Sequence, residues 1–123
     1  MAEQLSFKEM CARFEVTPRT LRYYEYIELL SPDKEGRSRF YGPREIARMT
    51  LILRGRRWGF SLEEIRRWLE TYESDGTATQ NREFIRMADR QLAALEEERD
   101  NINRSIEDLG ALRRQVSAGL DDT

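Results

Sequence analysis

The stretch of sequence that decides the fold is Val16-Thr17-Pro18-Arg19-Thr20-Leu21-Arg22-Tyr23-Tyr24-Glu25. Thr17 predicts a helix start, because its hydroxyl can accept a hydrogen bond from an unpaired N–H of the first turn, and Pro18 has no N–H to leave unpaired. With 3.6 residues per turn, Leu21 faces one way and a stripe of four side chains faces the other. That stripe consists of Arg19, Arg22, Tyr23 and Tyr26. The pattern predicts a helix with one cationic and aromatic face.

Such a face is suited to DNA. Arginine donates to guanine edges in the major groove and to phosphates, and tyrosine hydroxyls add phosphate contacts that fix the register of a protein on the duplex. A plainer interpretation is that the arginines are only solvated and the tyrosines pack half-buried against the rest of the chain. The sequence on both sides favours the DNA-binding interpretation.

The composition excludes several classes of function. The chain has 123 residues, with no histidine and one cysteine, Cys11. It therefore lacks the residues for histidine acid–base catalysis, multi-cysteine zinc sites or iron–sulfur ligation by this chain alone, and we predict no catalytic residue, no metal site and no cofactor. An enzyme is the least favoured class. No apolar run approaches the ~20 residues that span a bilayer, and the first six residues do not resemble a signal peptide, so the expected location is the cytoplasm.

The charge of the chain is unevenly distributed. The formal net charge is −2, yet residues 17–67 contain twelve basic and seven acidic residues, a local charge of +5. Residues 81–123 contain seven basic and ten acidic residues, a local charge of −3. The cationic field thus belongs to the first part of the chain, as expected if that part binds nucleic acid.

A short amphipathic helix is predicted before the stretch quoted above. Ser6 and Glu9 form a capping-box pattern, and apolar residues follow at helical spacing at Phe7, Met10, Cys11 and Phe14. Because Cys11 lies on this apolar stripe, we interpret it as a core residue and not as a redox or metal-binding group. A break at residues 15–16 then separates two short helices by a tight turn, which is helix-turn-helix spacing.

Residues 33–41 predict a small β-hairpin, or wing. The preceding Leu29-Leu30-Ser31-Pro32 ends the second helix, because the residue before a proline avoids helical angles. In a strand, Arg37, Arg39 and Tyr41 would alternate with Ser38 and Phe40 and would present basic and aromatic groups on one side. The alternative is a solvated loop.

Two further helices are predicted after Gly42-Pro43. The third helix should bury Ile46, Met49, Thr50 and Leu53, and it carries a cluster of arginines near its end at Arg54, Arg56 and Arg57. Ser61 and Glu64 form a second capping box, which opens a fourth helix. Its inner face should consist of Leu62, Ile65, Leu69 and Tyr72, with Trp68 beside them.

The last third of the chain predicts a dimerisation helix. Residues 74–80 are polar and without period, which indicates a linker, and residues 81–116 follow a heptad pattern. The seam residues are Ile85, Ala88, Leu92, Leu95, Arg99, Ile102, Ile106 and Leu109. So long a stripe favours pairing with a second chain over folding back on the first part. Arg99 would fix the register or meet Glu96 or Glu98 of the partner helix. Residues 117–123 are predicted to be a disordered tail.

Four sequence blocks resemble, in order, the signatures of the MerR family of bacterial transcription regulators. They are Leu21-Arg22-Tyr23-Tyr24-Glu25, Leu29-Leu30-Ser31-Pro32, Arg39-Phe40-Tyr41 and Gly59-Phe60-Ser61-Leu62-Glu63-Glu64-Ile65. The resemblance implies an all-α fold with a minor β-hairpin wing, in which residues 1–73 form a winged helix-turn-helix DNA-binding domain and residues 81–116 form the coiled coil.

The resemblance also implies roles for residues. Arg19, Arg22 and Tyr23 would lie in the major groove, Arg39 and Tyr41 would contact the DNA backbone from the wing, and Arg56 or Arg57 would contact phosphates. The family usually carries a glycine and an aromatic residue where this chain has Arg37 and Ser38. The complete set of candidate DNA-binding residues is Thr17, Arg19, Arg22, Tyr23, Tyr26, Arg37, Arg39, Tyr41, Arg56 and Arg57.

For the whole protein, the resemblance implies an antiparallel coiled-coil homodimer on double-stranded promoter DNA with a pseudo-palindromic site. The bound dimer would bend and untwist the promoter so that RNA polymerase can engage both promoter elements. Metal and redox sensors of the family use cysteines near the dimer helix that this chain lacks. Residues 51–62 look most like regulators of branched-chain amino-acid and acyl-CoA degradation genes.

Two other classes of function compete with this interpretation. An architectural DNA-bending or excisionase-like factor shares the basic head, but it has no need for a long dimer helix. A coiled-coil adaptor that binds other proteins accounts for the long helix, but it leaves the +5 charge and the four sequence blocks unexplained. The DNA around the gene, with a footprint within it, would discriminate among the three.

Overall fold

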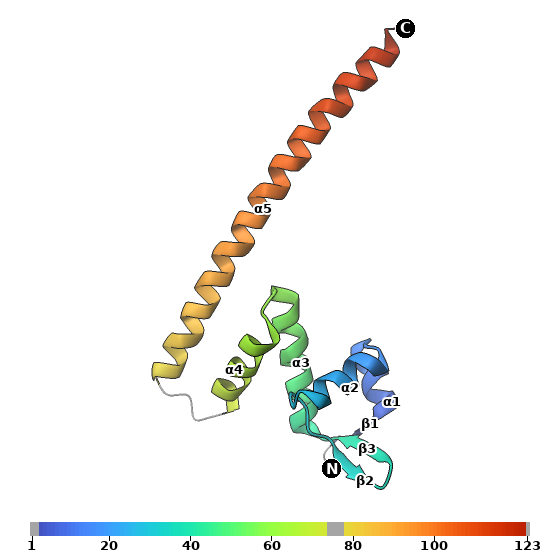
Figure 1. The fold of residues 1–123 in the computed structure, drawn as a ribbon, viewed down its shortest axis with the longest axis vertical. Helices are drawn as coiled ribbons and strands as arrows, with labels where there is room; N and C mark the ends of the chain where they lie inside the picture. The colour runs from blue at the N-terminus through green and yellow to red at the C-terminus, as the bar shows by residue number, and fades with distance from the viewer. Residues whose placement is uncertain (1–2, 74–77, 123) are drawn as a thin grey trace. The chain divides into compact units, whose positions relative to one another are not determined.

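The computed structural model describes residues 3–73 and 78–122, and these form two units, Met1–Gln80 and Asn81–Thr123 (Figure 1). We call the first unit the head. It contains the elements β1 (Leu5–Ser6), α1 (Phe7–Phe14), α2 (Pro18–Tyr26), β2 (Asp33–Glu35), β3 (Ser38–Tyr41), α3 (Pro43–Trp58) and α4 (Leu62–Glu73). A single helix, α5 (Ala78–Asp121), makes up nearly all the rest. The predicted fold class is confirmed, since the chain is mostly helical with one small antiparallel sheet.

Local capping explains where α1 and α2 begin. The Ser6 hydroxyl accepts from the N–H of Glu9 at 3.2 Å, and the Glu9 carboxylate accepts from the N–H of Ser6 at 3.0 Å. The chain reverses at Glu15, whose φ of 53° is left-handed. The Thr17 hydroxyl then accepts from the N–H of Thr20 at 3.1 Å, and Pro18 occupies the first turn of α2. Both predicted helix starts and the turn between them are confirmed.

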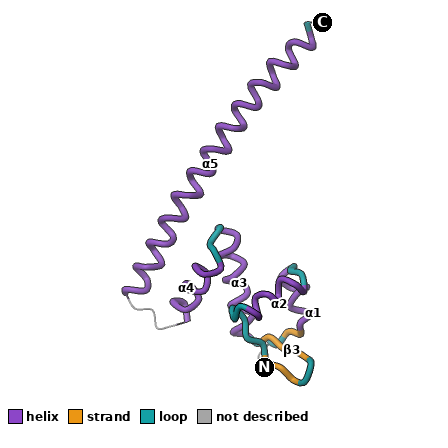
Figure 2. Tube along the Cα trace, in the orientation of Figure 1, coloured by secondary structure: helices purple, strands orange, loops and turns teal. Residues whose placement is uncertain are grey.

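The sheet has the strand order β1-β3-β2, so β3 is its central strand. Figure 2 shows the strands in orange, with β3 labelled. Phe40 is opposite Asp33 on one side and Ser6 on the other, and Tyr41 is opposite Leu5. Gly36, with a φ of 60°, makes the left-handed turn between β2 and β3. The hairpin prediction is confirmed, but the strand β1 was not predicted, because two residues are too few to show an alternating pattern.

The buried face of α3 differs from the prediction. Met49 is fully buried as expected, but Thr50 is exposed, and Ile46 and Leu53 are half-buried. The buried positions are instead Glu45, Met49, Leu51, Ile52 and Gly55. A pattern of apolar residues at helical spacing does not predict this face. One of its members, Glu45, is a carboxylate whose burial depends on polar partners, and another, Gly55, is a glycine.

The helices α3 and α4 form the second pair of the head. The Ser61 hydroxyl accepts from the N–H of Glu64 at 3.1 Å and the Glu64 carboxylate accepts from the N–H of Ser61 at 2.9 Å, which confirms the second capping box. Ile65 and Leu69 are fully buried and Leu62 is half-buried, as predicted, whereas the side chain of Tyr72 lies outside the described part.

The helix α5 is longer than predicted. Its 44 residues begin at Ala78 and continue to Asp121, so the linker assigned to residues 78–80 and the disordered tail assigned to residues 117–121 are wrong. Residues 74–77 and Thr123 lie outside the described residues. No proline interrupts residues 117–121, and Leu120 continues the heptad seam by one position. None of the helices within residues 3–73 and 78–122 has the length and hydropathy of a transmembrane span.

Candidate nucleic-acid interface

The helix α2 has one buried face and one exposed face. Leu21 is fully buried and Tyr24 is 7% exposed, and these two side chains hold α2 on the core. On the opposite face Tyr23 is 48% exposed and Tyr26 is 83% exposed, beside the exposed Arg19 and Arg22. The predicted stripe is therefore confirmed as a surface of two arginines and two tyrosines.

A groove of about 540 Å³ runs beside this face. The helix α2 supplies one side of the groove with Arg19, Thr20, Arg22, Tyr23, Tyr24 and Tyr26, and Arg56 and Leu62 supply the other. Arg56 is held there by a hydrogen bond of 3.4 Å from its Nη1 to the carbonyl of Phe60. The candidate residue Arg57 is exposed but does not line the groove. The last turn of α3 thus places a cation, Arg56, beside the exposed face of α2.

Glu25 joins the wing to α2. Its Oε2 accepts from the Tyr41 hydroxyl at 2.6 Å, and its Oε1 lies 3.0 Å from Nε of Arg39. Tyr41 is fully buried, so its assignment as a DNA-backbone contact is wrong. The reason is the unpredicted strand β1, which pairs with β3 at Tyr41 and covers that position. Arg39 keeps about a third of its side chain exposed and remains a candidate contact, with Arg37 exposed at the tip of the wing.

A second groove, of about 340 Å³, lies between the wing and the start of α1. Its lining includes four cations, Lys8, Arg22, Arg37 and Arg39. The guanidinium carbons of Arg22 and Arg39 lie 5.4 and 5.5 Å from the centre of the Phe7 ring, within cation–π distance. Lys8 and Phe7 were not predicted to lie on this surface. The pairing of β1 with β3 brings the start of α1 beside the wing. This pairing could not be predicted from the local sequence pattern.

Cys11 is half-buried on α1. Burial raises the pKa of the Cys11 thiol above its ordinary value, although the charge of Arg22 acts in the opposite direction. A thiol that keeps its proton is a poor nucleophile and a poor metal ligand. Within residues 3–73 and 78–122, no group of three or more histidine, cysteine, aspartate or glutamate residues could hold a metal ion.

Two family models match the chain. "MerR HTH family regulatory protein" matches residues 5–72, and "MerR, DNA binding" matches residues 46–118. Each covers more than half of the sequence. This chain belongs to the MerR family. It is a DNA-binding transcription regulator with a winged helix-turn-helix head and a long C-terminal helix.

Curated relatives agree with the assignment to the MerR family. The regulator is 32% identical over 111 residues to an uncharacterised HTH-type transcriptional regulator of Pseudomonas aeruginosa, covering 89% of this chain and 77% of the relative. It is 32% identical over 113 residues to the HTH-type transcriptional regulator HmrR of Rhizobium leguminosarum, with coverages of 91% and 81%. With ZntR of Escherichia coli it shares 40% identity over 63 residues, which is 50% of this chain and 45% of that protein.

Solved structures share the fold of the MerR-family regulator. A transcriptional regulator of the MerR family from Bacillus cereus superposes with a TM-score of 0.70 at 28% identity, covering 85% of this chain and 76% of that one. HiNmlR, a MerR family regulator lacking the sensor domain and bound to promoter DNA, gives a TM-score of 0.66 at 18% identity, with coverages of 85% and 80%. The second likeness bears on the fold alone.

Proposed function

We propose that this MerR-family regulator is a homodimer that binds a pseudo-palindromic promoter site, each subunit placing α2 in one of two successive major grooves. The observation that carries the proposal is the exposed face of α2, where Arg19, Arg22, Tyr23 and Tyr26 project from a helix anchored on its other side. A helix of this kind reads base edges with its first turns. Thr17 fixes the start of α2, and its exposed position suits a backbone contact.

Phosphate contacts would come from arginines on α3 and on the wing. Arg56 lines the first groove and the exposed Arg57 follows it in α3, while Arg37 and Arg39 line the second groove. Contacts from arginine to phosphate position a protein on the duplex without reading its sequence. The head would therefore hold the DNA backbone on both sides of the major groove that α2 enters.

Dimerisation would use the apolar seam of α5. Ile85, Leu92, Ile102, Ile106 and Leu109 are all more than half exposed, while Leu95 is 36% exposed. A heptad seam of this length is stable in water only when a partner helix covers it, and a second copy of α5 supplies a matching seam. The resemblance to the family indicates that the two helices pair antiparallel, with Ala88 in the seam and Arg99 near its middle.

The proposed dimer would also distort the promoter DNA. A structural neighbour is described as bound to promoter DNA, and its fold matches that of this regulator. If the dimer bends and untwists the promoter for RNA polymerase, the deformability of the spacer contributes specificity at base pairs that no side chain contacts.

The relatives bear differently on the effector of this regulator and on its target genes. One relative is a heavy metal-dependent transcription regulator of Rhizobium meliloti, 32% identical over 89 residues. We do not extend that dependence to this chain, because its sequence has no histidine and one half-buried cysteine. The resemblance to regulators of branched-chain amino-acid and acyl-CoA degradation gains no support from the relatives and stays a prediction, as does the cytoplasmic location.

Selection of duplexes from a random pool by the full chain, followed by hydroxyl-radical footprinting, tests the proposal. A dimeric regulator selects two inverted half-sites and protects the backbone symmetrically about their centre. An architectural factor would protect DNA without selecting inverted half-sites. An adaptor would select nothing.

A further inference from the structure

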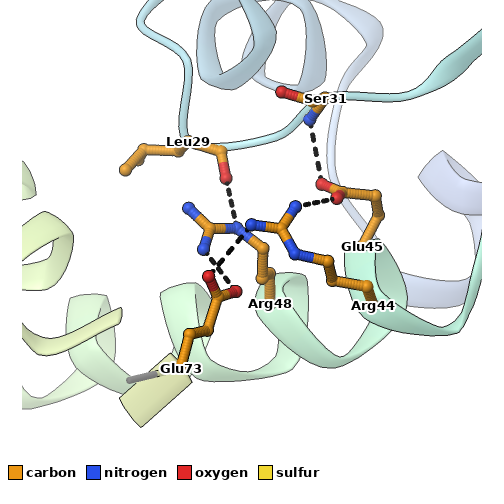
Figure 3. Close-up of polar contacts among 6 residues, drawn as sticks. All are labelled: Leu29, Ser31, Arg44, Glu45, Arg48 and Glu73. Atoms are coloured by element: carbon orange, nitrogen blue, oxygen red, sulfur yellow. Dashed lines mark hydrogen bonds and ion pairs between the residues drawn. The ribbon is translucent and has the colours of Figure 1, made fainter. Parts of the chain in front are cut away.

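Two arginines of the head contact the last residue of α4, Glu73 (Figure 3). Its Oε1 accepts from Nη1 of Arg48 at 2.6 Å, and its Oε2 accepts from Nη2 of Arg44 at 2.9 Å. Both arginines belong to α3. One carboxylate therefore ties the end of α4 to the first half of α3 through two charge-assisted hydrogen bonds.

The same two arginines also connect Glu73 to residues 27–31, which follow α2 and which we call the exit segment. Arg48 contacts this segment directly, and Arg44 contacts it through Glu45. Nε of Arg48 donates to the carbonyl of Leu29 at 2.8 Å. Arg44 donates to Glu45 at 2.6 Å, and the other oxygen of Glu45 accepts from the N–H of Ser31 at 2.9 Å. One backbone acceptor and one backbone donor of the exit segment thus depend on side chains of α3.

The exit segment is in turn bonded to the last turn of α2. The carbonyl of Tyr24 accepts from the N–H of Leu29 at 2.9 Å and from the N–H of Leu30 at 3.3 Å. Leu29 and Leu30 are buried, and Glu28 holds a left-handed φ of 64°. A carbonyl of α2 and the Arg48 guanidinium therefore contact the same residue, Leu29, from its two sides.

Because Arg48 is mostly buried, its position depends on the ion pair with Glu73. The Arg48 side chain is 12% exposed and that of Glu73 is 35% exposed. A poorly hydrated cation needs a nearby anion, so without Glu73 the guanidinium would turn toward water and release the Leu29 carbonyl. Although partial burial acts in the opposite direction, the hydrogen bonds from Arg48 and Arg44 hold the pKa of Glu73 below its ordinary value, which keeps it ionised at neutral pH.

We propose that Glu73 is a positioning residue for the recognition helix: by holding Arg48 on the Leu29 carbonyl, it fixes the C-terminal end of α2 and thereby the placement of the DNA-reading face. The proposal rests on the proposed DNA-binding function. It adds a specificity-determining role for a residue that is remote in sequence from α2 and is the last residue of α4.

The test compares four full-length variants with the wild type. Glu73→Gln removes the charge, and Arg48→Lys keeps a cation for Glu73 but removes the Nε donor to Leu29. The third is the double variant. Glu70→Gln, an exposed position on the same helix, makes the same charge change as Glu73→Gln and is the control. Glu73→Asp, which keeps the charge on a shorter side chain, is a fifth protein to be used if either single variant unfolds.

The first readout is amide hydrogen exchange in the free protein. Glu73→Gln and Arg48→Lys should both speed exchange at residues 24–31, whereas Glu70→Gln should leave it unchanged. The second readout is affinity for a labelled duplex that the wild type selects from a random pool, and for a shuffled duplex of equal length. Each single variant should bind the selected duplex about tenfold more weakly, with little further loss in the double variant.

Affinity for the shuffled duplex decides between positioning and general damage. It should change by less than about threefold, because the phosphate-contacting arginines are untouched. Equal losses on both duplexes, or a Glu73→Gln variant that behaves like Glu70→Gln in both readouts, would overturn the proposal. If the wild type selects no duplex, the proposed function fails, and the exchange measurement alone still decides whether Glu73 orders the exit segment.

Discussion

The hydroxyl of Tyr41 donates to the carboxylate of Glu25 at 2.6 Å, and this bond joins the central strand β3 to the helix α2. The same carboxylate pairs with Arg39, a wing cation that keeps part of its surface in solvent. The wing and α2 would present their cations to one duplex, so their relative placement matters for binding. Because Glu25 contacts both Tyr41 and Arg39 of β3, we expect it to help fix that placement.

Replacing Tyr41 by Phe should destabilise the head without removing a DNA contact. The substitution leaves the Glu25 carboxylate without its buried donor, which costs about 1–3 kcal/mol in the free energy of unfolding. Urea unfolding measures the loss. Tyr26→Phe makes the same chemical change at a residue that is 83% exposed, and it should stay within about 0.5 kcal/mol of the wild type. Equal effects of the two variants would mean that the Tyr41–Glu25 bond contributes nothing.

The contribution of Tyr41 should also depend on pH. Burial, followed by the hydrogen bond to Glu25, raises the pKa of Tyr41 above its ordinary value of 10.0. Above that pH the unfolded chain releases the proton while the folded chain retains it, so the free energy of unfolding falls as the pH rises. The stability difference between wild type and Tyr41→Phe, measured by urea unfolding between about pH 8 and 11, should therefore shrink above about pH 10. A difference that stays constant over this range would contradict the shift.

Gly55 allows α3 and α4 to approach. A Cβ at this position would lie 2.8 Å from Cγ1 of Ile65, closer than real contacts allow. Gly55→Ala should lower the free energy of unfolding, because overpacking costs about 1–3 kcal/mol and outweighs a helix-propensity gain of up to about 1 kcal/mol. Gly119→Ala is the control, since a Cβ there meets nothing within 4 Å. Thermal unfolding that ranked Gly119→Ala as the more damaging change would refute this packing account.

The arginines of α2 and of the wing should differ in what they contribute to DNA binding. If Arg22 reads a base, Arg22→Ala weakens binding to the selected duplex by about 1–3 kcal/mol and relaxes preference at one symmetric pair of positions. Arg39→Ala should weaken binding to all duplexes similarly, because phosphate contacts carry no sequence information. Arg114→Ala removes the same charge from α5, outside the head unit, and should leave both unchanged. A binding-site selection with the pattern of Arg22 and Arg39 reversed would exchange their roles.

The seam of α5 should hold the dimer together. Replacing Leu95 and Ile102 by Asp would place charges in the seam at a cost of several kcal/mol each, and the dimer should dissociate. Ala94→Asp adds one such charge at an exposed position outside the seam and should leave the dimer intact, whereas Leu95→Asp alone should weaken it. Sedimentation at micromolar concentration makes the comparison. A wild-type monomer, or a doubly substituted dimer, would remove the seam from the account.

The helix starts and the exposed face of α2 could be predicted from the sequence because they depend on neighbours in the chain. Ser6, Thr17 and Ser61 each cap the helix that immediately follows them. The burial of Tyr41 depends instead on β1, a two-residue strand that pairs across 36 positions of sequence with β3. Alternation along β3 alone placed Tyr41 with Arg37 and Arg39, on the surface.

The burial of Glu45 escaped prediction for a related reason. A carboxylate is expected to be exposed, and its burial is acceptable here because the N–H of Ser31 and the Arg44 guanidinium both donate to it. Arg44 also donates to Glu73, which is 28 positions beyond Glu45 in the chain. The buried face of α3 was predicted from apolar residues at helical spacing. This method does not identify a residue such as Glu45, whose burial depends on polar contacts.

The salt dependence of DNA binding tests the central claim most directly. Arg39, Arg56 and Arg57 in each of two subunits, with the two recognition helices, should make on the order of 6–10 phosphate contacts, so affinity for the selected duplex should fall roughly 10³–10⁵-fold between 50 and 200 mM salt. This steep fall is predicted despite the formal net charge of −2, because the counterions released are those at the cationic head. An affinity that hardly changed over the same range would show that the head is not a DNA-binding surface.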